Sequence, residues 1–336
     1  MDRRSNVGIK KAEKVLCMVL AMAMAMVITI NVSAGESISK AKIDEYLYTI
    51  AYSQQEQVKE PIYGSIDGEW NIIGLARYGA VTKDYISKYK ENLLKEVKTK
   101  DGVLSTRKYT EYSRVVIALA SIDENSTNFG GYNLLKPLAE FDNVNKQGIN
   151  GSIYALIAIH SSNYKIPKPD KNYTGEVTTV KKLIEYIIKN QNSDGGWSMA
   201  DKSECDITAM AVQALSFYYT GSDKSVKKSV DKALKFLSRQ QNNDGGYSAE
   251  GISNCESTAQ VLMAISALNI NIEDSRFVKN GNTVLNGLLD YYSNGKFSHT
   301  KNGGYNHMAT EQGFCALTAY YRSLTIMNGF YDMADG

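Results

Sequence analysis

The sequence predicts an all-α protein in which helical hairpins close into two concentric rings, an α6/α6 toroid. The first observation is a repeated turn: Gln-Asn-Ser-Asp-Gly-Gly-Trp at 191–197 returns as Gln-Asn-Asn-Asp-Gly-Gly-Tyr at 241–247. The second is that a helical pattern precedes each turn and a small, apolar helical pattern follows it. The third is that the first helix of each unit carries more Lys and Glu, so we expect it outside and the second helix inside.

The glycine pair of this turn suits a chain that leaves one helix in a left-handed conformation and then reverses direction. Residues with a β-carbon resist that backbone geometry. We interpret Gly303-Gly304-Tyr305 as a weaker third copy of the turn.

The rest of the chain fits the same plan with degenerate turns, which gives six hairpins. Six is the number at which such rings close, and closure removes the apolar ends that an open solenoid must cap. The expected outer helices are 43–54, 84–97, 132–141, 180–190, 226–239 and 284–292, and the expected inner helices are 70–80, 112–121, 152–161, 209–215, 259–268 and 313–321.

The N-terminus has the order of a secretory signal peptide. A basic stretch from Arg3 to Lys14 is followed by an uncharged apolar run from Val15 to Ile30 and by the small residues Ser33 and Ala34. The run is shorter than the roughly 20 residues of a spanning helix. We therefore expect residues 1–34 to be removed, with no transmembrane segment afterwards, and 35–336 to form one domain of a secreted or cell-surface protein.

Composition restricts the class of partner and the source of stability. The formal net charge is +2, with 38 basic and 36 acidic residues, so no strong field favours nucleic acid or an anionic membrane. Cys205, Cys255 and Cys315 are too few for a disulfide-built scaffold. The hydrophobic core must therefore supply the stability, although a Cys205–Cys255 disulfide stays open as an alternative.

The Gln-x-x-Asp-Gly-Gly-Trp turn followed by a Thr-Ala helix resembles the repeat of the terpenoid-cyclase and protein-prenyltransferase superfamily. That resemblance implies an α6/α6 toroid over nearly all of the mature chain. The segments Glu69-Trp70, Asn150-Gly-Ser152, Cys255-Glu-Ser-Thr-Ala-Gln260 and Ala309-Thr-Glu-Gln312 are similar to a secreted bacterial branch related to the cobalamin-binding barrels of intrinsic factor and transcobalamin.

Aligning the inner helices on Thr208, Thr258 and Thr310 brings their starts to one end of the ring, which we call the mouth. A concave site with carboxylates and aromatic walls is expected there. Arg77 and Arg114 lie on inner helices, where a charge needs a partner, and the mouth carboxylates are candidates. The predicted ligand-binding residues are Glu69, Trp70, Glu111, Tyr112, Asn150, Thr208, Gln260, Glu311 and Gln312.

Asp206 and Glu256 are the candidate catalytic acids. Squalene-type cyclases have Asp-x-Asp-Asp-Thr-Ala where this chain has Glu204-Cys-Asp206-Ile-Thr-Ala, so the resemblance implies Asp206 as a proton donor. The structural alternative is a capping box in Ser203-Glu-Cys-Asp206 and in Ser253-Asn-Cys-Glu256, with each acid near free helix amides.

Cys205, Cys255 and His307 occupy the same position on three successive inner helices. Thiolate and imidazole ligands suit zinc, and three protein ligands with an open fourth position would be a catalytic type of site. Helix spacing of about 8 to 10 Å argues against convergence of these three side chains, so buried structural cysteines are the alternative.

The sequence is compatible with three functions. The first is a binding protein that holds a small molecule, a glycan or a protein at the mouth. The second is an enzyme of cyclase or prenyltransferase type, with Asp206 as acid or with zinc on Cys255 and His307. The third is a carbohydrate-active enzyme, because unrelated α6/α6 barrels cleave polysaccharides with two acids. Whether the protein is an enzyme at all is not decided by the sequence.

Overall fold

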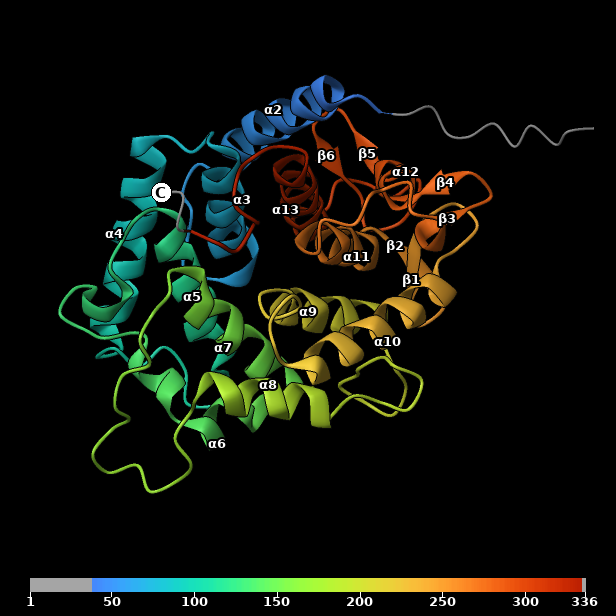
Figure 1. Cartoon of the computed structure of the whole chain (residues 1–336). Helices are drawn as coiled ribbons and strands as arrows, with labels where there is room; N and C mark the ends of the chain where they lie inside the picture. Colours follow the sequence, from blue (N-terminus) through green and yellow to red (C-terminus); the bar gives the residue numbers. More distant parts are fainter. Residues whose placement is uncertain (1–37, 334–336) are drawn as a thin grey trace, which may run out of the picture. The chain divides into compact units, whose positions relative to one another are not determined.

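The computed structural model describes residues 38–333, which lie in the compact unit Ser37–Gly336. The predicted signal peptide, residues 1–34, lies outside the described residues. Within this unit the inner helices form a ring and the outer helices surround it (Figure 1). The all-α toroid predicted from the repeats is therefore confirmed.

The inner ring closes on itself. Each inner helix packs against the next one along the chain, and the last packs against the first. The apolar faces of the terminal hairpins are thus covered by one another. The inner helices are α3 (Trp70–Tyr78), α5 (Thr110–Ser121), α7 (Ile149–Ser161), α9 (Cys205–Ser216), α11 (Cys255–Ala267) and α13 (His307–Ser323).

The outer layer is regular except in the third hairpin. Its helices are α2 (Lys40–Gln57), α4 (Lys83–Thr99), α8 (Val180–Lys189), α10 (Lys224–Gln240) and α12 (Val284–Leu289). The predicted outer helix at 132–141 is wrong. Short 3₁₀ turns at Lys136–Ala139 and Asn145–Gln147 flank the four-residue helix α6 (Phe141–Val144) there. Pro137 lies inside this segment and cannot donate a helical hydrogen bond, which favours the short turns.

Short antiparallel hairpins occupy several of the connections between outer and inner helices. β1 (Tyr247–Ala249) pairs with β2 (Ile252–Asn254), β3 (Val278–Lys279) with β4 (Asn282–Thr283), and β5 (Tyr292–Ser293) with β6 (Lys296–Phe297). The two copies of the Asp-Gly-Gly turn make the same bonds. The Gln191 amide donates to the carbonyls of Gly195 and Ser229, and the Gln241 amide donates to those of Gly245 and Phe277.

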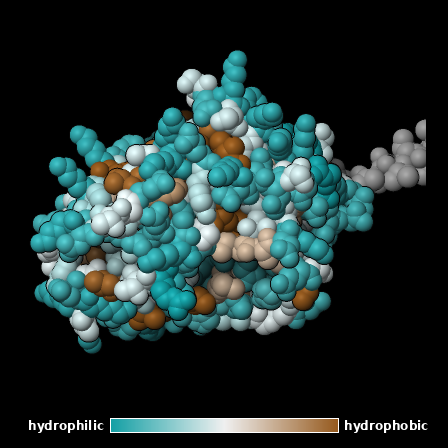
Figure 2. Space-filling view, turned by 90° about the horizontal axis from the view of Figure 1, so that it is seen from below, coloured by the Kyte–Doolittle hydropathy of each residue, from teal (hydrophilic) through white to brown (hydrophobic). Residues whose placement is uncertain are grey.

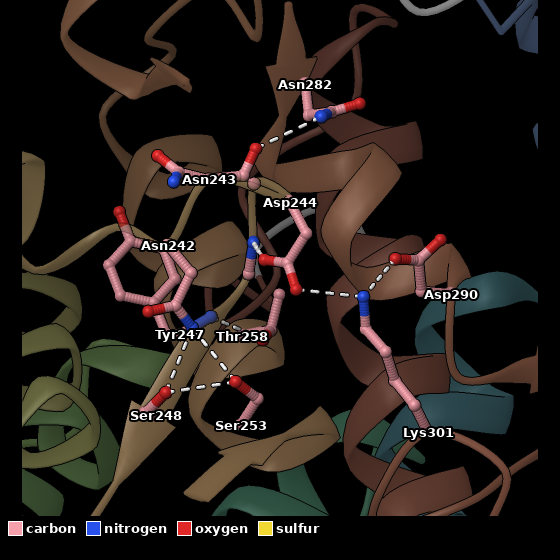
Figure 3. A network of polar contacts seen from close by, with 12 residues as sticks. Asn242, Asn243, Asp244, Tyr247, Ser248, Ser253, Thr258, Asn282, Asp290 and Lys301 are labelled. Carbon is pink, nitrogen blue, oxygen red and sulfur yellow. Dashed lines mark hydrogen bonds and ion pairs between the residues drawn. The ribbon is translucent and has the colours of Figure 1, made fainter. Parts of the chain in front are cut away.

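A threonine of the following inner helix completes each turn. Thr258 Oγ1 accepts a hydrogen bond from the backbone N–H of Tyr247 at 3.0 Å, as Thr208 does from Trp197 at 2.9 Å. In Figure 3 the Asn242 amide reaches two serine hydroxyls, while Lys301 lies between the carboxylates of Asp244 and Asp290. The motif is thus a polar clasp that ties the outer helix to the inner one.

The third copy of the turn lies elsewhere than predicted. Thr310 Oγ1 accepts from the N–H of Phe297 at 3.0 Å, so Phe297 takes the place of Trp197 and Tyr247. Asn294 and Gly295, both at positive φ, make the turn between β5 and β6. Tyr305 instead lies on the returning segment, paired with Ser298. The prediction relied on the Gly-Gly-Tyr sequence at 303–305. The Asn-Gly pair at 294–295 forms a two-residue hairpin turn equally well.

The outer surface is mainly polar. Figure 2 shows one side of the molecule, where hydrophobic residues form separate patches among hydrophilic ones. None of the helices in the described part of the chain combines the length and the hydropathy needed to cross a membrane.

The end of the ring opposite the mouth is crossed by the segment that follows α13. Arg77 on α3 donates to the carbonyls of Gly329 and Asp332, and the N–H of Met333 donates to Ser161 O at the end of α7. This red segment is visible beside α3 in Figure 1. It places the buried side chain of Tyr331 toward the centre of the ring.

Candidate functional site

A buried ion pair lies at the mouth, where the inner helices begin. Glu69, fully buried just before α3, accepts a hydrogen bond at 2.8 Å from Nε of Arg114 on α5. The N–H of Gly64 and the hydroxyl of Tyr89 also donate to this carboxylate. Burial raises the pKa of Glu69, and Arg114 opposes that rise. The expectation that a mouth carboxylate pairs with Arg114 is confirmed. The same expectation was wrong for Arg77, which donates to backbone carbonyls at the opposite end of the ring.

The segment from Gly64 to Glu69 folds into an irregular loop over the mouth. Asp67 has φ +59°, a left-handed conformation that Asp tolerates better than most residues. A β-carbon at Gly68 would lie 2.4 Å from the carbonyl oxygen of Ile62, so only glycine fits there. The N–H of Asp67 donates to Glu311 Oε1 at 2.7 Å, which brings the loop onto α13.

Glu311 is a strongly perturbed acid of this cluster. Its side chain is only 1% exposed, and burial raises its pKa to about 8, with further contributions from the charges of Asp67 and Glu69. The carboxyl group is therefore largely protonated at neutral pH. A carboxyl group held neutral among other charged groups is typical of functional sites.

Two carboxylate–histidine pairs lie farther out on the mouth. His307 Nδ1 is 2.6 Å from Asp67 Oδ1, and His299 Nδ1 is 2.7 Å from Glu256 Oε2. Both imidazoles are substantially exposed, at 40% and 50% of their side-chain area. The other oxygen of the Glu256 carboxylate is buried and has no hydrogen-bond partner among the described residues.

Below this rim a small cavity of about 40 Å³ occupies the centre of the ring. Three predicted ligand-binding residues, Trp70, Gln260 and Gln312, line it together with Tyr154. The ring centroids of Trp70 and Tyr154 are 5.8 Å apart, and the Gln260 amide donates to Gln312 Oε1 at 3.1 Å. This volume holds a few water molecules, whereas ligand pockets usually span about 300 to 1,000 Å³.

The capping boxes proposed for Asp206 and Glu256 are wrong. α9 is capped by Glu204 without a side-chain bond, and Asn254 caps α11 by accepting from the N–H of Ser257. The helices begin one residue later than the boxes require, and Ser203 instead donates to Asp194 in the turn. Both acids therefore lie in the first turn of their helices, outside the predicted boxes. Burial raises the pKa of Asp206.

The three candidate zinc ligands are not brought together. Within residues 38–333, no three His, Cys, Asp or Glu side chains are placed to hold a metal ion. Cys205 and Cys255 are buried free thiols whose pKa is raised by burial, and Sγ of Cys255 lies 3.6 Å from the carbonyl oxygen of Ala309. The spacing of packed helices separates side chains that hold the same position in successive repeats.

The remaining predicted ligand-binding residues differ in burial and in their hydrogen-bond partners. Glu111 accepts from the hydroxyl of Tyr63 at 2.7 Å, and the charges of both residues act on Arg114, so it joins the mouth cluster. Asn150 keeps a buried amide oxygen without a partner among the described residues. Tyr112 is buried with its hydroxyl against the N–H of Ser105. Thr208 is fully buried and its hydroxyl is used in the turn.

Asp67, Tyr154 and His299 were not among the residues predicted for the mouth. Asp67 carried a detectable signal, because the Asp-Gly pair at 67–68 marks a turn directly before the predicted mouth residue Glu69. Tyr154 and His299 had none, since their roles depend on which other helices and loops the ring brings beside them.

The ring of paired helices defines the class of protein: an α/α toroid whose inner helices begin at one polar end. The chain belongs to the family of the prenyltransferase alpha-alpha toroid domain, whose model matches residues 92–310. Among solved structures it is similar to a mutant of unsaturated glucuronyl hydrolase from Streptococcus agalactiae, with a TM-score of 0.50 and 12% identity, covering 87% of this chain and 94% of that one. That likeness concerns the fold alone. No curated protein matches the chain.

Proposed function

We propose that this protein is exported and binds a glycan at the mouth of the toroid. The observation that carries the proposal is the exposed carboxylate–histidine pair of Asp67 and His307, next to the buried carboxyl groups of Glu69 and Glu311. Trp70 lines the cavity below this rim. Carboxylate and imidazole groups hydrogen-bond sugar hydroxyls, and an aromatic face packs against the apolar side of a sugar ring. Figure 1 supports a common location, since α3, α5 and α13 are neighbours in the ring.

The small central cavity favours a ligand that rests on the rim. A polyprenyl chain needs a deep apolar chamber, while here the ring centre holds about 40 Å³ and Tyr331 lines its inner end. A sugar chain that lies across the mouth needs no such depth. The alternative outcomes of a binding experiment are binding of a small apolar ligand and binding of a protein.

Binding is tested with the purified chain 35–336 on a glycan array, followed by calorimetry with each glycan that is retained. We expect His307→Ala and Trp70→Ala each to weaken binding at least tenfold. Tyr52→Ala is the control, because this exposed tyrosine lies on outer helix α2 and is 65% exposed. Retention of peptides in place of glycans, or equal binding by the Trp70 variant, would overturn the proposal.

Hydrolysis of a glycan is a second candidate, favoured by the state of Asp206. This half-buried acid has a raised pKa, which favours the protonated form that a general acid needs. The comparison structure is a glucuronyl hydrolase, which makes uronic-acid glycans the first substrates to assay. We expect Asp206→Asn to abolish release of reducing ends while it leaves glycan binding within threefold. Binding without any release would leave the first proposal standing alone.

Export is tested by expressing the full chain in a bacterial host with a secretion pathway. We expect the N-terminus of the exported protein to begin at Gly35. Protein that stays in the cytoplasm with Met1 intact would contradict export.

A further inference from the structure

A second pocket lies at the opposite end of the toroid from the mouth. It has a volume of about 170 Å³ and is enclosed by the last turns of α9, α11 and α13 and by the segment 327–332. The inner helices begin at the mouth, so their C-terminal ends necessarily face away from it. None of the residues placed in the mouth cluster contributes to this pocket.

The walls of the pocket combine aromatic and thioether side chains with polar residues that include Gln213, Asn269 and Asp332. Phe217, Phe330 and Tyr331 supply aromatic surface, and Met263 and Met327 supply adaptable thioethers. The ring of Phe217 is held in place because His160 stacks on it with centroids 3.7 Å apart. A volume of about 150 Å³ lined by apolar side chains is known to accept a single benzene ring, so the size matches one aromatic ring.

One polar group among the lining residues lacks a partner. Ser266 is 5% exposed and its buried hydroxyl makes no hydrogen bond within the described residues. The hydroxyls of Ser216 and Ser323, which also line the pocket, already donate to the carbonyls of Gln213 and Tyr320. A buried hydroxyl without a partner costs about 1 to 3 kcal/mol, and a ligand hydroxyl would remove that cost.

The wall made by the segment after α13 is fixed before any ligand arrives. Arg322 donates through Nε to Asn328 O at 2.8 Å, and Arg77 donates to the carbonyls of Gly329 and Asp332 at 3.0 and 2.7 Å. A pocket whose walls are already ordered loses little binding free energy to rearrangement.

From these features we infer that this pocket, formed by the ends of α9, α11 and α13 and the segment 327–332, binds a single-ring aromatic molecule that carries one hydroxyl group. Phenol represents this class. Tyr331 lines both this pocket and the small central cavity, so an occupant contacts the side chain that closes the ring centre from below.

The inference is tested with phenol, with toluene as the probe without a hydroxyl group, by ligand-detected NMR on the chain 35–336. Soaking crystals in 4-bromophenol locates the molecule through the anomalous signal of bromine. We expect bromine beside Phe217 and Phe330, and we expect phenol to bind more tightly than toluene.

Two variants separate the pocket from the rest of the protein. Ala267→Phe fills it from a partly exposed position on the last turn of α11, and we expect phenol to bind at least tenfold more weakly. Ser266→Ala is expected to reduce the preference for phenol over toluene by a factor of about 3 to 10. His307→Ala, at the mouth, is expected to leave phenol binding unchanged.

Bromine at the mouth, unchanged phenol binding by a folded Ala267→Phe protein, or no binding of either probe up to its solubility would each overturn the inference. The outcome is independent of glycan binding, because neither Asp67, His307 nor Trp70 lines this pocket. Circular dichroism of each variant shows whether it is folded.

Discussion

The acid Glu311 shows how one residue couples the stability of the fold to the chemistry of the mouth. Its carboxyl group is buried beneath the loop that contains Asp67, and its pKa rises from 4.5 to about 8. The unfolded chain releases this proton near pH 4.5, whereas the folded protein keeps it until about pH 8. The stability contributed by Glu311 is therefore complete below pH 4.5 and is lost as the pH rises to 8.

Glu311→Gln is expected to remove this dependence, since the amide keeps an oxygen that can accept from the Asp67 N–H and has no proton to lose. The unfolding free energy of the variant, relative to the parent, should increase by on the order of 2 to 4 kcal/mol between pH 4.5 and 8. Urea denaturation at several pH values measures it. Glu185→Gln on the exposed face of α8 is the matched control and should leave the pH profile unchanged. Parallel pH profiles for parent and Glu311→Gln would disprove this assignment.

At the scale of the elements, the Asp-Gly-Gly clasp determines how an outer helix passes into an inner one. Gly245 combines a φ of +86° with a close approach to its neighbours. A β-carbon there would lie 2.1 Å from the carbonyl oxygen of Thr283. Gly251, in the turn between β1 and β2, has a similar φ of +80°, but a β-carbon added there would meet no atom within 4 Å. Substitution of each glycine by alanine therefore distinguishes the cost of backbone strain from the cost of steric conflict.

Gly251→Ala is expected to lower the unfolding free energy by about 1 to 2 kcal/mol, the cost of a left-handed residue with a β-carbon. Gly245→Ala carries the same strain and must also displace the chain at Thr283, so we expect a loss of about 3 kcal/mol or more. Denaturant titration of the two variants gives the comparison. Equal losses would mean that the approach to Thr283 does not constrain the clasp.

At the scale of the molecule, stability depends on the seam where the last inner helix meets the first. Gly74 on α3 permits this contact: a β-carbon there would lie 2.8 Å from Cδ1 of Phe314 and 3.2 Å from Sγ of Cys315 on α13. These side chains come from opposite ends of the described chain, so the contact is made only when the ring closes.

Gly74→Val is expected to lower the unfolding free energy by about 1 to 3 kcal/mol through overpacking of the seam. Because every hairpin has a neighbour on both sides, we expect a single unfolding transition to be retained, as seen by circular dichroism and by tryptophan fluorescence. Gly304→Ala, where nothing lies within 4 Å, is the control and should change stability by less than about 0.5 kcal/mol. An unchanged unfolding free energy for Gly74→Val would show that close contact between α3 and α13 at this position does not limit stability.

The fold was largely predictable from the sequence, because the features that define the repeat depend on residues close together in the chain. Glycine at the turns, charged outer helices and small-residue inner helices are each properties of nearby residues, and together they indicated the ring. The outer helix of the third hairpin was predicted wrongly, since a helical pattern of apolar residues did not outweigh the proline at 137. The third turn was misplaced because two glycine-containing turns compete within a few residues.

The repeat pattern was enough to predict that Glu69 and Glu311 lie at the mouth and that Trp70 and Gln260 face the ring. Their surroundings depend on the folded ring: Arg114 pairs with Glu69, burial beneath the loop of Asp67 raises the pKa of Glu311, and Cys205, Cys255 and His307 stay apart. The second pocket likewise depends on the segment 327–332 returning across the ends of the helices. The physical reason is that charge, burial and cavity shape arise between segments far apart in the chain, whereas turns and helices arise within them.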